Sequence, residues 1–137
     1  MRGTAVLCEA ARNHHHNAFL LVSTDEVYGD VATGRSREDD GLKPRSPYSA
    51  SKAGGEHLAR AYAESFGLPL LVTRGSNNYG PYQFPEKLIP VLVTNAIDDL
   101  PLPLYNDGSA VRDYIYVEDH CRAIDTVLHE APIGSDQ

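Results

Sequence analysis

Two short apolar runs on either side of a long helical pattern constrain the fold more than any other feature of this sequence. The runs are Ala18–Thr24 (AFLLVST) and Leu68–Arg74 (LPLLVTR), and both are continuous rather than alternating. A continuous apolar run of this length is typical of a strand buried on both faces, as in a parallel sheet. Parallel neighbours need a long crossover connection, which the intervening chain can supply as a helix. The sequence therefore predicts an α/β fold with a parallel sheet.

Helical patterns surround these two runs. One helix is expected from Pro47 to about Ser65, because Ser46 is a suitable N-cap, a proline fits the first turn and Gly67 can end it. Other helices are expected over 85–97, over 1–13 with an inward face of Val6, Leu7, Ala10 and Ala11, and over 118–130 with an inward face of Cys121, Ile124, Val127 and Leu128. Residues 113–117 have β character, and residues 30–45 are expected to form a loop.

Composition argues against several classes of function. Twelve basic against 19 acidic residues give a net charge of −7, so neither nucleic acid nor an anionic membrane is an expected partner. No apolar run approaches the ~20 residues of a membrane-spanning helix. Cys8 and Cys121 make no disulfide framework, so we expect a cytoplasmic protein with both cysteines as small apolar fillers. The histidines at 14–16 lack an acidic or cysteine partner at useful spacing, so no metal site is expected.

Tyr48 and Lys52 lie four residues apart in the predicted helix (YSASK) and therefore share one of its faces. A nearby ammonium favours the phenolate and lowers the tyrosine pKa from about 10. A tyrosine tuned in this way can act as a general base toward an alcohol, as removal of hydride from a carbinol requires. Taken alone, the pair is more often an ordinary surface contact.

Thr24 ends the first apolar run, and Asp25 and Glu26 follow it, at the edge where open α/β sheets bind their ligands. Neighbouring carboxylates push their pKa values apart, which can leave one as proton donor and the other as base. Side chains alternate along a strand, so both carboxylates can serve one site only if the strand has ended by Asp25. The alternative is the acidic N-terminus of a helix capped by Thr24 or Asp25.

Two further polar segments are ambiguous by themselves. Residues 76–81 (SNNYGP) carry amides that can bind sugar hydroxyls or a carboxamide, although Asn and Gly also simply form turns. Arg112, in the stretch RDYIYVED, could bind a phosphate with both of its terminal nitrogens, or could instead pair with Asp113 or another nearby acid.

Taken together and in this order, the segments resemble the extended short-chain dehydrogenase/reductase family, and within it the nucleotide-sugar 4,6-dehydratases. The resemblance extends from Gly3 to about Ala131 and rests on the stretches STDEVYGD, SPYSASKAGGEHL, TRGSNNYGPYQFPEKLIP and VRDYIYVEDH. Asp25 favours the dehydratases, because the family's sugar epimerases and decarboxylases usually lack it. A UDP-sugar epimerase or decarboxylase, or an inactive fragment, is the alternative.

The resemblance implies a hydro-lyase that converts dTDP-glucose to dTDP-4-keto-6-deoxyglucose with NAD. Tyr48, assisted by Lys52, would take the proton of the sugar 4-hydroxyl while hydride leaves carbon 4. Glu26 would then take the proton at carbon 5, Asp25 would protonate the leaving 6-hydroxyl, and the hydride would return at carbon 6. NAD would contact Tyr48, Lys52 and Asn78, and the sugar nucleotide would contact Thr24, Asn77, Lys87, Leu88, Pro103, Leu104, Tyr105 and Arg112, with Lys87 and Arg112 at the diphosphate.

The resemblance also sets expectations for the chain as a whole. Residues 1–75 would form the C-terminal half of an NAD-binding Rossmann domain, and residues 76–137 a substrate-binding segment mixed with returning Rossmann elements. The family's glycine-rich GxxGxxG turn does not occur in the sequence, so we expect a fragment that lacks most of the cofactor site. The helices at 1–13 and 46–65 would pack against their copies in a homodimer.

Overall fold

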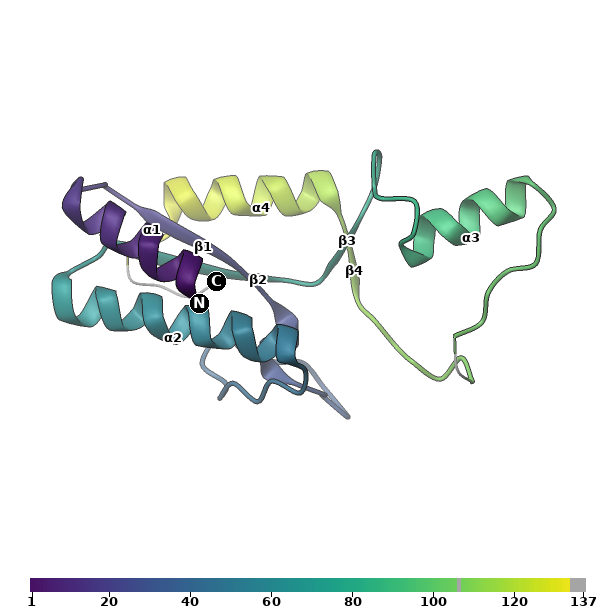
Figure 1. Cartoon of the computed structure of the whole chain (residues 1–137), viewed down its shortest axis with the longest axis horizontal. Coiled ribbons are helices and arrows are strands. Elements are labelled where there is room, and N and C mark those ends of the chain that lie inside the picture. The colour runs from purple at the N-terminus through teal and green to yellow at the C-terminus, as the bar shows by residue number, and fades with distance from the viewer. Residues whose placement is uncertain (106, 134–137) are drawn as a thin grey trace.

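The computed structural model describes residues 1–105 and 107–133, and they form a layered α/β arrangement (Figure 1). Strands β1 and β2 pair in parallel, with Phe19 opposite Leu70 and Thr24 opposite Gly75. Helix α2 packs on both strands with α1 beside it, whereas α4 packs on β2 from the other side. The elements are α1 (Arg2–Asn13), β1 (Phe19–Thr24), the 3-10 helix η1 (Asp25–Tyr28), α2 (Pro47–Phe66), β2 (Leu70–Gly75), β3 (Asn77–Tyr79), α3 (Leu88–Ile97), β4 (Tyr114–Tyr116) and α4 (Val117–Glu130).

Helix α2 has the ends that its sequence predicts. The Ser46 hydroxyl accepts a hydrogen bond from the Ser49 amide, and the Ser49 hydroxyl accepts one from the Ser46 amide, both at 3.0 Å. This reciprocal capping box satisfies two amides that the first turn would otherwise leave unpaired. Gly67 ends the helix in the left-handed conformation, with φ of 69°.

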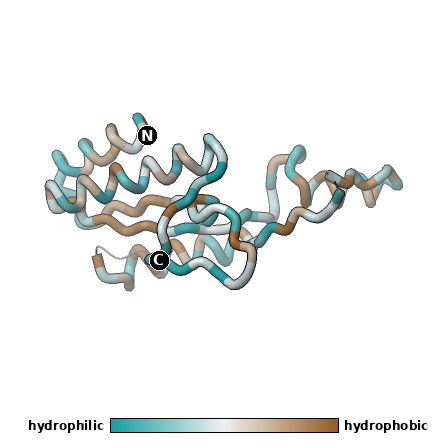
Figure 2. Tube along the Cα trace, turned by 90° about the horizontal axis from the view of Figure 1, so that it is seen from below, coloured by the Kyte–Doolittle hydropathy of each residue, from teal (hydrophilic) through white to brown (hydrophobic). Residues whose placement is uncertain are grey.

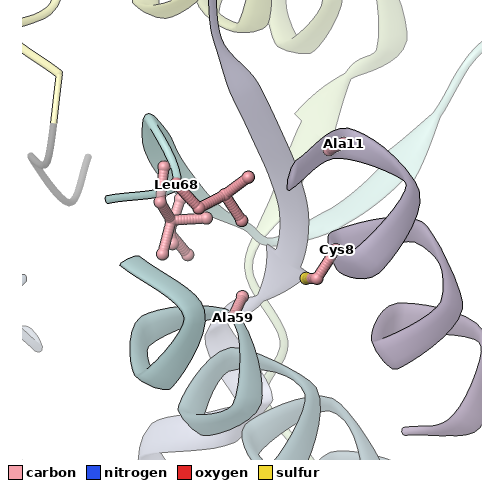
Figure 3. Close-up of a cluster of buried hydrophobic side chains, with 6 residues drawn as sticks. Cys8, Ala11, Ala59 and Leu68 are labelled. Carbon is pink, nitrogen blue, oxygen red and sulfur yellow. The ribbon is translucent and has the colours of Figure 1, made fainter. Parts of the chain in front are cut away.

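The core lies between α1, α2 and the two strands. Cys8, Ala11 and Ala59 point into it together with Leu68, Leu70 and Val72 (Figure 3). In Figure 2 the apolar stretches of the chain run through the strands between the helical layers. The prediction that both strands are buried on both faces holds for most of β2, but is wrong for β1, whose Val22 is 39% exposed.

The inward face predicted for α1 is wrong except at Ala11. Val6 and Leu7 are 61% and 60% exposed, and Cys8 is buried instead. The reason is the closeness of α1 to α2, because a Cβ at Gly55 would lie 3.2 Å from the Thr4 hydroxyl. Only small side chains fit such an approach, so the larger apolar residues of α1 face outward.

The second half of the chain departs further from its predictions. Residues 77–79 form β3, which pairs in parallel with β4, and the sequence did not predict it as a strand. Helix α3 begins at Leu88 rather than at 85. Cys121 is exposed and Leu128 is 42% exposed, so both are wrongly predicted as inward, because the contacts of α4 with β2, β3 and β4 cover only part of its surface.

None of the helices described here is long and apolar enough to cross a membrane. Among the same residues, no three His, Cys, Asp or Glu side chains are grouped so that they could hold a metal ion.

Candidate active site

An open cleft of about 500 Å³ lies at the carboxyl ends of β1 and β2, between the α2 side of the sheet and the start of α3. This is the edge where parallel α/β sheets bind ligands. The cleft brings together most of the residues that the sequence singled out: Thr24, Glu26, Tyr48, Lys52, Asn77, Asn78, Lys87 and Leu88.

The strand ends before Asp25, as it must if both carboxyl groups are to serve one site. β1 ends at Thr24, and η1 begins at Asp25. The Thr24 hydroxyl caps η1 by accepting from the Glu26 amide at 3.4 Å, and it lies 3.3 Å from Asp25 Oδ1. The two interpretations of this motif are therefore compatible, since the capped acidic turn also carries Glu26 into the cleft.

Asp25 is half-buried and does not line the cleft itself. Burial raises its pKa above the ordinary value, and the charge of Asp113 adds to this, while hydrogen bonds from the Thr24 hydroxyl and backbone amides oppose it. A carboxyl group with a raised pKa keeps its proton to higher pH. Asp25 thus has the property that a proton donor needs.

Tyr48 and Lys52 reach the cleft from the first turns of α2. The Lys52 ammonium donates a hydrogen bond to the Val22 carbonyl at 2.7 Å, which fixes it to the end of β1. Tyr48 is 55% exposed, so its hydroxyl is accessible to a ligand in the cleft.

His120 and Gln83 line the cleft as well, and the sequence argument missed both. His120 Nδ1 lies 2.7 Å from Asn78 Oδ1 and must be the donor, because an amide oxygen only accepts. The Gln83 amide donates to the Asn78 carbonyl at 2.9 Å. Gln83 Oε1 and His120 Nε2 are buried without a hydrogen-bond partner among the described residues. Their only sequence signal is that each lies within a stretch that carries the resemblance.

Some predicted ligand-binding residues lie outside the cleft. Pro103, Leu104, Tyr105 and Arg112 belong to the long connection between α3 and β4, which extends away from the β1–β2 sheet (Figure 1). Leu104 is 74% exposed, and Arg112 donates to the carbonyl of neighbouring Val111. Their contact with a sugar nucleotide stays a prediction.

The chain is similar to proteins of one family over nearly its whole length. Over residues 1–136 the chain matches the model of the NAD dependent epimerase/dehydratase family. It is 54% identical over 132 residues to a dTDP-glucose 4,6-dehydratase of Actinoplanes, covering 96% of this chain and 41% of that protein. It is 52% identical over 134 residues to the low-salt glycan biosynthesis protein Agl12 of Haloferax volcanii, covering 98% and 43%. The chain thus spans about two fifths of the length of these relatives.

Solved structures agree with these relatives. The dTDP-glucose 4,6-dehydratase of Bacillus anthracis, determined in complex with NAD, has a TM-score of 0.94 at 53% identity, with 98% of this chain and 44% of that one covered. A UDP-glucuronic acid 4-epimerase of Bacillus cereus has a TM-score of 0.90 at 33% identity, covering 97% and 43%. The predicted Rossmann-like α/β fold class is confirmed, and the chain belongs to the NAD dependent epimerase/dehydratase family.

Proposed function

We propose that the protein containing these residues is a hydro-lyase that removes water from dTDP-glucose to give dTDP-4-keto-6-deoxyglucose. The observation that carries the proposal is the position of Asp25, a carboxyl group with a raised pKa, next to a cleft that holds Glu26 and Tyr48. A dehydration needs a base and a separate proton donor, and these three side chains supply both. The relatives at about 50% identity that are named dTDP-glucose 4,6-dehydratases support the same reaction.

The residues of the cleft fit the nicotinamide end of NAD. Tyr48, Lys52 and Asn78 line it, and the buried Gln83 Oε1 has no described partner. Such an unpaired acceptor is satisfied by a donor such as a carboxamide N–H. When bound, NAD would supply the acceptor that takes hydride from carbon 4 of the sugar and returns it at carbon 6.

The chain's own residues would then move the protons. Tyr48 reacts as the phenolate, which the positive charge of Lys52 favours, and it becomes a neutral phenol when it takes the proton of the 4-hydroxyl and carbon 4 turns into a ketone. The ketone acidifies the proton on carbon 5, which Glu26 removes. Asp25 gives its proton to the 6-hydroxyl, which leaves as water. When hydride returns to carbon 6, Glu26 gives its proton back to carbon 5, so that the product differs from the substrate by one water.

Lys87 is proposed as a diphosphate partner. It occupies the N-cap of α3 and lines the cleft, so it directly precedes the amides that the first turn of α3 leaves unpaired. A helix N-terminus and a lysine together favour a phosphate group.

The assay uses the full-length polypeptide that contains these residues, with NAD and dTDP-glucose or a UDP-sugar. The proposal expects a keto product that is lighter than dTDP-glucose by one water. Tyr48→Phe should abolish it, whereas Tyr82→Phe, at a fully exposed tyrosine, should not. A UDP-sugar converted to an isomer of unchanged mass would indicate the epimerase alternative instead.

We also propose a homodimer formed through α1 and α2. It is supported by the outward-facing Val6 and Leu7, which place apolar surface beside α2. Leu7→Glu should convert the dimer to a monomer in light scattering, whereas Arg122→Glu, at an exposed residue of α4 outside the proposed interface, should not. A wild-type protein that is monomeric at every concentration would contradict this interface.

The remaining proposals concern organisation and location. Residues 1–75 and 76–137 are proposed as the Rossmann half and the mixed substrate-binding segment. The free thiols of Cys8 and Cys121 support a reducing compartment, and we propose the cytoplasm.

A further inference from the structure

A buried ion pair beneath the cleft has no part in the proton transfers. Arg74, near the end of β2, is 4% exposed and Glu56 of α2 is 0% exposed. Arg74 Nη2 and Nε both donate to Glu56 Oε2, at 2.8 and 3.0 Å. Buried ion pairs of this kind are often replaceable by apolar residues without loss of stability, so stability alone explains this one poorly.

The same guanidinium also holds two other segments. Its Nη1 donates to the Tyr28 hydroxyl at 2.6 Å and to the Glu38 carbonyl at 3.0 Å. Its carbon lies 5.0 Å from the centre of the Tyr28 ring. Burial alone would lower the pKa of Arg74, but hydrogen bonds to Glu56 and Tyr28 outweigh burial and raise it. Arg74 is therefore a permanent cation that joins β2, α2, η1 and the loop before α2.

The segments joined in this way carry the proposed acid–base residues. Glu56 follows Lys52 by one helical turn and Tyr48 by two, on the same side of α2. Tyr28 is the last residue of η1, the single turn that begins with Asp25 and Glu26. Only a guanidinium offers donors in several directions within one rigid plane, so one side chain can fix both segments relative to each other.

We propose that Arg74 is a positioning residue that sets the distance between the Tyr48–Lys52 pair and the Asp25–Glu26 pair. The proposal rests on the proposed function. Proton transfer to and from a bound sugar requires each group within hydrogen-bond distance of its target, and a shift of about 1 Å can cost on the order of 100-fold in rate. η1 carries Asp25 and Glu26, so its link to Arg74 matters more for the elimination than for the oxidation.

Tyr28→Phe tests the link, because it keeps the ring and removes only the acceptor of the Arg74 hydrogen bond. In amide hydrogen exchange, we expect residues 26–29 to exchange roughly tenfold faster than in the wild type, the scale of one hydrogen bond to a charged group. Tyr62→Phe, the same chemical change at the far end of α2, is the matched control and should leave this segment unchanged. Unaltered exchange of residues 26–29 in Tyr28→Phe would overturn the proposal.

Rapid quenching of the reaction gives a second readout. In Tyr28→Phe, elimination should slow about tenfold while oxidation at carbon 4 stays near the wild-type rate, so the 4-keto hexose accumulates before water is lost. The KM for the sugar nucleotide should change less than twofold. A purely structural role would lower both steps by the same factor, through loss of folded protein, and that result would also overturn the proposal.

Arg74→Lys provides a variant that keeps the charge but loses the forked geometry. Arg74→Lys should reproduce both effects of Tyr28→Phe. If it instead keeps the wild-type exchange of residues 26–29 and the wild-type ratio of the elimination rate to the oxidation rate, a guanidinium is not needed. If the wild-type protein fails to dehydrate dTDP-glucose, the proposed function fails, but the exchange experiment still decides whether Arg74 positions η1.

Discussion

A side chain at Gly75, the last residue of β2, should destabilise the protein, and Gly75→Ala tests how tightly the floor of the cleft is packed. A Cβ at this position would lie 2.6 Å from both Cε1 and Nε2 of His120. Real Cβ atoms essentially never come so close, so the imidazole ring must move. Moving it breaks the 2.7 Å hydrogen bond from His120 to Asn78.

The cost follows from these contacts. Overpacking a core costs about 1–3 kcal/mol and the lost hydrogen bond about 0.5–1.5 kcal/mol. Replacing Gly by Ala recovers about 0.4–1 kcal/mol by restricting the unfolded chain. The net loss is about 2 kcal/mol, which for 137 residues lowers Tm by about 7 °C.

Thermal unfolding followed by circular dichroism measures this loss. Gly3→Ala is the matched control, because a Cβ at Gly3 meets nothing within 4 Å. This substitution should raise the stability slightly, since Gly3 lies in α1 and alanine favours a helix more than glycine does. Adding His120→Ala to Gly75→Ala should recover part of the loss, with a coupling energy of about 1 kcal/mol. A Gly75→Ala protein as stable as the wild type, or no coupling to His120, would refute the packing argument.

Three further predictions concern the acid–base residues and α2. Tyr48→Phe should lower turnover at least about 100-fold with an unchanged circular dichroism spectrum, and near-normal turnover would contradict its role as base. The pKa of Asp25 is higher in the folded than in the unfolded protein, so folding favours its protonated form. Its contribution to stability is therefore complete at pH values below the unfolded pKa and is lost as the pH rises through the folded pKa. Asp25→Asn should therefore stabilise the protein more at pH 7 than at pH 3 in urea unfolding, and an equal effect at both pH values would show that burial does not perturb this carboxyl group. Ser46→Ala should cost about 1 kcal/mol in the same measurement, because it removes half of the capping box of α2, and a cost near zero would rule out the cap.

Features that depend on local signals could be predicted from the sequence. The ends of α2 follow from Ser46 and Gly67, whose roles depend on neighbouring residues alone. The site residues near the carboxyl ends of the strands could be predicted from the parallel topology and from the sequence stretches that resemble the family. The placement of Thr24, Tyr48 and Lys52 in one cleft agrees with that argument.

Features that depend on distant partners could not be predicted. β3 is three residues long and exists through pairing with β4, far along the chain. The buried face of α1 is set by its close approach to Gly55, which favours small residues where periodicity favoured large ones. Arg74 and Glu56 are charged, and charged residues are expected at the surface. Their burial depends on the pairing of the two side chains, which only the fold brings together.

Deuterium on carbon 4 of dTDP-glucose follows the hydride through the proposed dehydration. With this labelled substrate, we expect the polypeptide containing these residues to release a 4-keto-6-deoxy product that carries the deuterium on carbon 6, because the hydride taken from carbon 4 is returned at carbon 6. Recovery of a nucleotide sugar that keeps its 6-hydroxyl and carries the deuterium on carbon 4 would show that the dehydration does not take place.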